Sequence, residues 1–295
     1  MQIHPPPSPL PSKGGGDEEL PGARPSQRRG EELRPSKGAT DEVKACCAAL
    51  YQNDYVRLLL GDSFHPGGEA LTRELGQAIG LTAAGHVLDV ASGRGTSAFV
   101  LAGAFGCRVT GLDYGRQNVA EANARAHPLC EFREGDAEQL PFEDATFDAV
   151  ISECAFCTFP SKADAAREMF RVLKPGGRLG LTDMTIAAQK LPPGLDNLLS
   201  VVACIGDARP AAEYRRILGE AGFERFVERD ESKHLLRLID DIRRKIDLAR
   251  FASAIKKLDL GGIDLQAARE TALLAKQAIE NGAAGYVMLT AVKPA

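Results

Sequence analysis

A run of small residues beside an acid lies in the first half of the chain, where residues 87–96 read V-L-D-V-A-S-G-R-G-T. Asp89 falls near the end of an apolar stretch, and Gly93 and Gly95 occupy the turn before an expected helix. Small residues in such a turn let the backbone approach a ligand closely. Asp113, which ends the next apolar stretch, is placed to accept hydrogen bonds from ribose hydroxyls. Together these residues predict a site for a nucleotide-like ligand.

Seven cysteines are spread along the chain, and this odd number argues against a disulfide framework. Cys107 and Cys130 stand at expected strand starts and are interpreted as structural. The other five fall in three segments that are expected to meet at the opposite end of the sheet. Thiolates are soft ligands that select soft acceptors, although a buried cysteine often serves as a small apolar side chain. The five are Cys46, Cys47, Cys154, Cys157 and Cys204.

Short apolar runs alternate with amphipathic stretches along most of the chain. This repetition predicts an α/β fold with a doubly wound, mostly parallel sheet that is covered by helices. Seven strands are expected, at 86–90, 107–112, 131–134, 147–152, 178–182, 223–229 and 285–292. Helices are expected at 42–60, 69–79, 96–105, 117–127, 161–173, 195–204, 208–221, 232–257 and 264–281, with Pro175, Gly176 and Gly177 as a stop after the fifth.

The composition divides the chain into three parts. Residues 1–40 are rich in proline, glycine and charge and hold almost no large apolar side chains, so we expect a disordered tail. An N-terminal helical cap is expected over 41–80. A single domain is expected over 81–295, with a ligand-binding core at 81–185 and a substrate-side part with a helical insertion at 186–295.

The overall charge and hydropathy exclude several classes of partner. The formal net charge of −4 gives no general attraction to nucleic acid or anionic lipid. No apolar run approaches the roughly 20 residues of a membrane span. The N-terminus reads M-Q-I-H-P-P-P without an apolar core, so we expect no secretory signal and a cytoplasmic location. The oligomeric state is left open.

Three further motifs follow the glycine loop in order: E-G-D-A-E-Q-L-P-F at 134–142, F-D-A-V-I-S-E at 147–153 and L-K-P-G-G-R-L-G-L at 173–181. With them, residues 80–185 resemble the class I S-adenosyl-L-methionine (SAM)-dependent methyltransferases, in the branch of the ubiquinone and menaquinone C-methyltransferases. The resemblance implies a Rossmann-like fold and SAM as the cofactor. A dinucleotide-dependent reductase would instead carry G-x-G-x-x-G, which this loop lacks.

The resemblance also implies a role for individual residues. The loop with Gly93 and Gly95 would pack against the methionine part of SAM, Asp113 would bind the ribose, and Tyr114 would stack on the adenine. Ala91 stands where the family usually has its first glycine. The implied cofactor-binding residues are Asp89, Ala91, Ser92, Gly93, Gly95, Thr96, Asp113, Tyr114, Asp136, Ala137 and, at the reacting end, Glu153.

The methyl acceptor is predicted from the cysteines. Their arrangement resembles that of the arsenite methyltransferases, of which this chain would be a divergent relative with Asp62 in place of one family cysteine. That resemblance implies trivalent arsenic held by three thiolates, with Cys47, Cys154 and Cys204 as the first choice. Cys46 and Cys157 are the other candidates, and which of the adjacent Cys46 and Cys47 faces the site stays open.

Two alternatives remain beside arsenite. One is C- or O-methylation of a small organic metabolite such as a quinone, which needs a base to deprotonate the acceptor. His65, in a loop bounded by proline and glycine, and Glu153 are the candidates for that base. The other is a SAM-binding protein that has lost catalysis.

Overall fold

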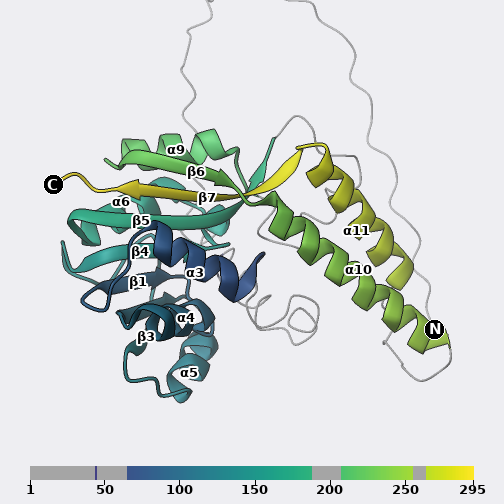
Figure 1. The fold of residues 1–295 in the computed structure, drawn as a ribbon, viewed down its shortest axis with the longest axis horizontal. Coiled ribbons are helices and arrows are strands. Elements are labelled where there is room, and N and C mark those ends of the chain that lie inside the picture. The colour runs from purple at the N-terminus through teal and green to yellow at the C-terminus, as the bar shows by residue number, and fades with distance from the viewer. Residues whose placement is uncertain (1–43, 45–64, 188–206, 255–263) are drawn as a thin grey trace, which may run out of the picture. The chain divides into compact units, whose positions relative to one another are not determined.

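The computed structural model describes residues 44, 65–187, 207–254 and 264–295. Within these ranges, seven strands form one sheet in the order β3-β2-β1-β4-β5-β7-β6 (Figure 1). The strands from β1 to β5 run parallel, and β7 is antiparallel to both of its neighbours, β5 and β6. The strands are β1 His86–Val90, β2 Arg108–Asp113, β3 Cys130–Glu134, β4 Phe147–Glu153, β5 Leu173–Ile186, β6 Glu224–Asp230 and β7 Ala284–Val292.

Helices connect these strands and cover the sheet. Within the same ranges, α3 packs against α4 and α6 packs against α9, while α5 lies against β2 and β3 (Figure 1). The predicted doubly wound, mostly parallel seven-stranded fold is confirmed. The helices are α3 Gly68–Ala78, α4 Thr96–Phe105, α5 Arg116–Ala124, the short 3₁₀ helix η1 Phe156–Thr158, α6 Lys162–Val172, α9 Ala211–Glu220, α10 Ser232–Ala254 and α11 Leu265–Glu280.

The order of the strands reverses beside β1, which pairs with β2 on one side and β4 on the other. Val87, Leu88 and Val90 of β1 are fully buried, as are Val150 and Ile151 of β4. Strands of a parallel sheet covered on both faces are apolar in nearly every position. The reversal opens a crevice at the carboxyl ends of β1 and β4, where a doubly wound fold binds its ligand.

Strand β5 is longer than predicted. The sequence suggested a turn at Pro175–Gly177 and a strand at 178–182, but β5 begins at Leu173, directly after α6, and runs to Ile186. Leu173 pairs with Phe147, and the register then shifts so that Arg178 pairs with Ala149. Gly176 lies within this irregularity and has a φ of 75°. Its positive φ lets the chain form a bulge there, so that the strand continues beyond it.

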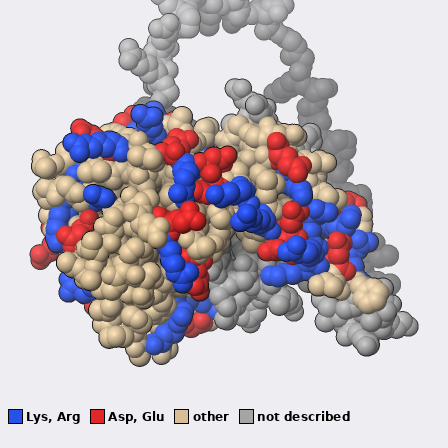
Figure 2. Space-filling view, viewed as in Figure 1, with Lys and Arg blue, Asp and Glu red and all other residues tan. Residues whose placement is uncertain are grey.

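The C-terminal part inserts a helical hairpin between the two last strands, as predicted. Helix α10 follows β6, α11 precedes β7, and the two helices pack against each other (Figure 1). Acidic and basic side chains are interspersed over α10 in Figure 2, which agrees with ion pairs such as Arg243 with Asp240 and Lys276 with Asp240. None of the helices in the described ranges is long and apolar enough to cross a membrane.

Several predicted features lie outside the described residues. They are the tail at 1–40, the cap helix at 42–60 except for Lys44, and the helix at 195–204, together with Cys46, Cys47 and Cys204. The remaining predicted helices and strands are all observed. β1 and α4 have the predicted ends, and the ends of the others differ from the prediction by at most five residues.

Candidate functional site

A pocket opens at the carboxyl ends of β1, β2 and β4, the position expected from the reversal in strand order. Twelve residues that were singled out in the sequence line it, and they come from segments spread over nearly 90 positions. These are His65, Asp89, Ala91, Ser92, Gly93, Thr96, Asp113, Tyr114, Asp136, Ala137, Glu153 and Cys154.

The loop after β1 forms the floor of the pocket through three residues with positive φ. Ala91, Gly93 and Gly95 have φ values of 60°, 52° and 79°. A Cβ added to Gly93 would meet no atom within 4 Å, so this glycine faces open space. A Cβ added to Gly95 would lie 2.4 Å from the ring of Phe132, so Gly95 is required by packing within the protein as well as by its φ. The predicted approach to a ligand therefore rests on Gly93.

Ala91 has a φ of 60°, in the left-handed region that favours glycine. An L-residue in the left-handed region is strained by about 1–2 kcal/mol. Glycine would relieve this strain, but it loses more conformational entropy on folding, which cancels part of the gain in stability. We expect Ala91→Gly to raise the free energy of unfolding by about 0.5–1 kcal/mol, measured by denaturant unfolding. Ala120→Gly, at an exposed position inside α5, is the control and should lower it by about 1 kcal/mol. A destabilised Ala91→Gly variant would contradict this interpretation.

Asp113 ties together two turns at the pocket wall. Its Oδ2 accepts the Gly93 N–H at 2.7 Å, and its Oδ1 accepts the Gly115 N–H at 2.8 Å and the Asn118 side-chain amide at 3.1 Å. Burial raises the pKa of this carboxyl group, while the hydrogen bonds from Asn118, Gly115 and Gly93 act in the opposite direction. Asp113 is therefore an anchor of the loop as well as a wall of the pocket.

Asp89 carries an almost fully buried carboxyl group at the pocket wall. Its Oδ2 has no hydrogen-bond partner, and neither does the buried Oγ of Ser92. Burial raises the pKa of Asp89 well above its usual range, and the charges of Glu153 and Asp113 raise it further. Buried polar atoms without a partner are costly unless something else satisfies them. Both residues line the pocket, so a polar ligand bound there is one way to supply the missing partners.

The raised pKa of Asp89 predicts a pH-dependent cost in stability. The folded protein holds the Asp89 proton to higher pH than the unfolded chain, so ionisation favours unfolding as the pH rises above the usual aspartate range. We expect Asp89→Asn to raise the free energy of unfolding by about 1 kcal/mol or more at about pH 8, and to raise it less at about pH 5. Thermal melts of both proteins across this range measure the difference, and a gain that shrinks as the pH rises would contradict the assignment.

Glu153 ends β4 and is held by hydroxyl groups from three elements. Its Oε2 accepts hydrogen bonds from Thr72 of α3 at 2.8 Å and Ser97 of α4 at 2.7 Å, and its Oε1 accepts one from Thr182 of β5 at 3.3 Å. The Tyr286 hydroxyl of β7 donates in turn to Thr182 at 3.0 Å. These donors fix the carboxylate in one orientation at the pocket wall.

His65 stands next to this carboxylate. Its Nε2 lies 3.7 Å from Glu153 Oε2 and 3.4 Å from Thr72 Oγ1. Its Nδ1 lies 3.2 Å from the carbonyl oxygen of Pro66, which can only accept, so this contact favours the tautomer with a proton on Nδ1. In that tautomer Nε2 carries a lone pair. Because the Thr72 hydroxyl donates its one proton to Glu153, it donates none to Nε2, and this lone pair is left for the hydroxyl group of an acceptor.

The described cysteines occupy different environments. Cys154 lines the pocket directly after Glu153, and its φ of 54° is unusual for a residue other than glycine. Cys157 is fully buried in the hydrophobic core. Cys107 and Cys130 lie at the amino ends of β2 and β3 with their thiols against carbonyl groups of α4, and burial raises the pKa of Cys130 to about 12. The structural role predicted for these last two agrees with their positions.

At the opposite wall, Asp136 and Ala137 follow β3, and Tyr114 follows β2 with 39% of its surface exposed. Several pocket residues were not predicted from the sequence. Ser97 and Asn118 lie in the first turns of helices that follow predicted acids, so their place in the fold was a usable signal. The full set is Lys44, Arg94, Ser97, Leu112, Asn118, Gly135, Ala155, Thr158 and Phe159.

Comparison with known proteins identifies relatives of this chain. A family model described as "Methyltransferase domain" matches residues 88–181. The 27-O-demethylrifamycin SV methyltransferase of Amycolatopsis mediterranei is 29% identical over 262 residues, which are 82% of this chain and 93% of the relative. The O-methyltransferase cnsE of Penicillium expansum is 30% identical over 236 residues, 76% of this chain and 78% of the relative.

Two further proteins are matched over a smaller share of their own length than the two relatives above. The arsenite methyltransferase of Halobacterium salinarum is 32% identical over 165 residues, 51% of this chain and 40% of the relative. Phosphoethanolamine N-methyltransferase 2 of Haemonchus contortus, solved in complex with SAM, superposes with a TM-score of 0.71 at 19% identity, over 90% of this chain and 61% of the other. The superposition supports the fold described above.

Proposed function

Because the chain belongs to the class I SAM-dependent methyltransferases and its relatives include enzymes of small molecules, we propose that it methylates a hydroxyl group of a small organic acceptor with His65 as the general base. The observation that carries the proposal is the pair of His65 and Glu153 in the pocket wall. Two relatives that align over more than three quarters of this chain support this choice, since one is named for 27-O-demethylrifamycin SV and the other is named an O-methyltransferase.

The pocket residues fit SAM. Gly93 leaves open space at the floor, and Asp89 Oδ2 and Ser92 Oγ offer buried, unpartnered polar atoms beside it. We assign these three to the methionine part, Asp113 to the ribose, and Asp136 to the adenine side. When bound, SAM supplies a methyl group that its sulfonium activates toward nucleophiles.

His65 has the contacts required of a base. Its Nε2 lone pair takes the proton of the acceptor hydroxyl, which leaves the oxygen as the nucleophile. The Nδ1–H of the resulting imidazolium donates to the Pro66 carbonyl oxygen, and its Nε2 lies 3.7 Å from the Glu153 carboxylate, which balances the new positive charge. Glu153 already accepts hydrogen bonds from three hydroxyl groups, so we assign it to orienting and charge stabilisation, not to proton removal. Such a base contributes about 100- to 10,000-fold to a rate.

Trivalent arsenic is the second candidate acceptor, and Cys154 is the observation that favours it. Its position in the pocket next to Glu153 suits a thiolate that holds a soft acceptor. The other thiols that such a site needs would come from Cys46, Cys47 or Cys204, which lie outside the described residues, because Cys157 is part of the core. In the described part of the chain, no group of three or more histidine, cysteine or acidic side chains is arranged to hold a metal ion.

An acceptor screen tests the proposal. Release of S-adenosylhomocysteine would be measured with phenols, alcohols, quinols, amines, and arsenite with glutathione. We expect turnover with a hydroxyl acceptor. Turnover with arsenite alone would move the function to the second candidate, and SAM binding without turnover on any class would indicate a catalytically silent protein.

A further inference from the structure

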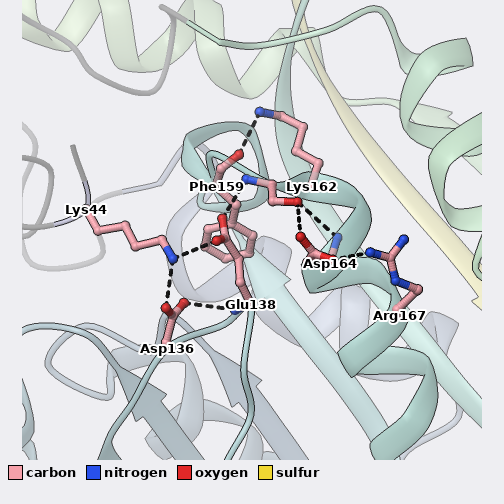
Figure 3. A network of polar contacts seen from close by, with 8 residues as sticks. Lys44, Asp136, Glu138, Phe159, Lys162, Asp164 and Arg167 are labelled. Atoms are coloured by element: carbon pink, nitrogen blue, oxygen red, sulfur yellow. Dashed lines mark hydrogen bonds and ion pairs between the residues drawn. The ribbon is translucent and has the colours of Figure 1, made fainter. Parts of the chain in front are cut away.

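A single lysine closes an ionic network at the adenine side of the pocket (Figure 3). The Lys44 ammonium donates to Asp136 Oδ2 at 2.7 Å and to Glu138 Oε2 at 2.6 Å. The side chain of Lys44 is only 11% exposed, and it lines the same pocket as Asp136. Its burial and its position in the pocket distinguish Lys44 from a lysine in an exposed surface ion pair.

The network also connects two walls of the pocket. Asp136 Oδ1 accepts the backbone N–H of Glu138 at 2.9 Å, which folds the 136–138 segment into a tight turn. Glu138 Oε1 accepts the Ser161 N–H at 2.6 Å, at the start of α6 and next to the loop that brings Phe159 to the pocket. Lys44 therefore holds a turn that is itself attached to the wall after β4.

The charges make the turn dependent on Lys44. Glu138, with 13% of its side chain exposed, and Asp136, with 30%, place two carboxylates around one ammonium. Burial alone would lower the pKa of Lys44, but hydrogen bonds and charge interactions with these two carboxylates raise it. Without the ammonium, two partly buried like charges would be left next to each other, which favours their separation.

We propose that Lys44 is a cofactor-positioning residue whose ammonium holds the 136–138 turn in the geometry that binds the adenine end of SAM. The contact leaves room for the cofactor, because a carboxylate oxygen can accept more than one hydrogen bond. The inference rests on the proposed placement of adenine beside Asp136. It predicts that Lys44 supports SAM binding, whereas a lysine that merely filled the adenine site would compete with SAM.

Calorimetric titration of SAM into the full chain distinguishes these roles by the sign of the effect. We expect Lys44→Met to raise the Kd for SAM about tenfold while kcat at saturating SAM stays within about twofold. Lys44→Arg should recover most of the affinity. Glu138→Gln should weaken SAM binding as well. In the double variant with Lys44→Met, the loss of SAM binding free energy should not exceed the sum of the losses in the two single variants. Lys174→Met breaks a 2.7 Å ion pair with Asp148 at the amino end of the sheet and should leave the Kd unchanged.

An unchanged or lower Kd in folded Lys44→Met would overturn the inference. Asp113→Ala separates this failure from a failure of the proposed function. If Asp113→Ala abolishes SAM binding and Lys44→Met has no effect, the pocket stands and only the role of Lys44 falls. If Asp113→Ala also leaves SAM binding intact, the assignment of the pocket falls with it.

Discussion

Replacing Asp113 with alanine is expected to weaken SAM binding at least about 100-fold, which corresponds to about 3 kcal/mol. The variant removes an acceptor for the proposed ribose contact and, at the same time, the anchor of two backbone turns. Gly93 and Gly115 each lose the carboxylate oxygen that their N–H groups contact, and Asn118 loses its partner. Hydrogen bonds to a charged group contribute about 1.5–3 kcal/mol each, so even partial loss accounts for the effect.

The measurement is a calorimetric titration with SAM, together with a thermal melt to confirm that the variant folds. Asp148→Ala serves as the control. Like Asp113, Asp148 accepts a hydrogen bond from a backbone N–H, that of His86, and it also pairs with Lys174, but it lies at the opposite end of the sheet. Asp148→Ala should bind SAM as the wild type does. A folded Asp113→Ala protein with wild-type affinity for SAM would refute the cofactor assignment.

The second large effect is expected at His65. His65→Ala should lower kcat about 100- to 10,000-fold and change the Kd for SAM by less than about threefold. The reason is that Nε2 faces Glu153 and the acceptor side, whereas the loop that holds SAM takes its hydrogen bonds from Asp113. Steady-state kinetics with the acceptor found in the screen, together with SAM titration, separate the two quantities.

Two controls distinguish a base from a structural histidine. Added imidazole should restore part of the activity of His65→Ala, because it replaces the lost proton acceptor without restoring any packing tied to the chain. His127→Ala removes a histidine that contacts Phe99 and lies outside the pocket, and it should retain full turnover. Equal losses in both variants, without rescue by imidazole, would show that His65 acts through stability alone.

Much of the fold could be predicted from the sequence, because the signals that define it are local. The apolar run of β1, the small residues after it and Asp113 at the end of β2 depend on neighbours within a few positions. Their meeting at one edge then follows from the parallel topology. Ala91 could be recognised as standing in a glycine position, and the structure adds the reason, a φ of 60°.

The parts that could not be predicted depend on contacts between distant segments. Thr72 and Thr182 meet at Glu153 from 81 and 29 positions away, and nothing in the local sequence marks an isolated threonine as a carboxylate ligand. Lys44 reaches Asp136 over 92 positions. Cys157 was one of the candidate ligands of the acceptor, but η1 places its side chain in the core, where it is fully buried.

The most direct test measures transfer of a labelled methyl group from SAM in the wild type, His65→Ala and Cys154→Ser side by side. Each protein would be given the hydroxyl acceptor found in the screen and, separately, arsenite with glutathione. We expect the wild type and Cys154→Ser to methylate the hydroxyl acceptor and His65→Ala to lose that activity. Methylation of arsenite that is lost in Cys154→Ser and kept in His65→Ala would contradict the proposed function.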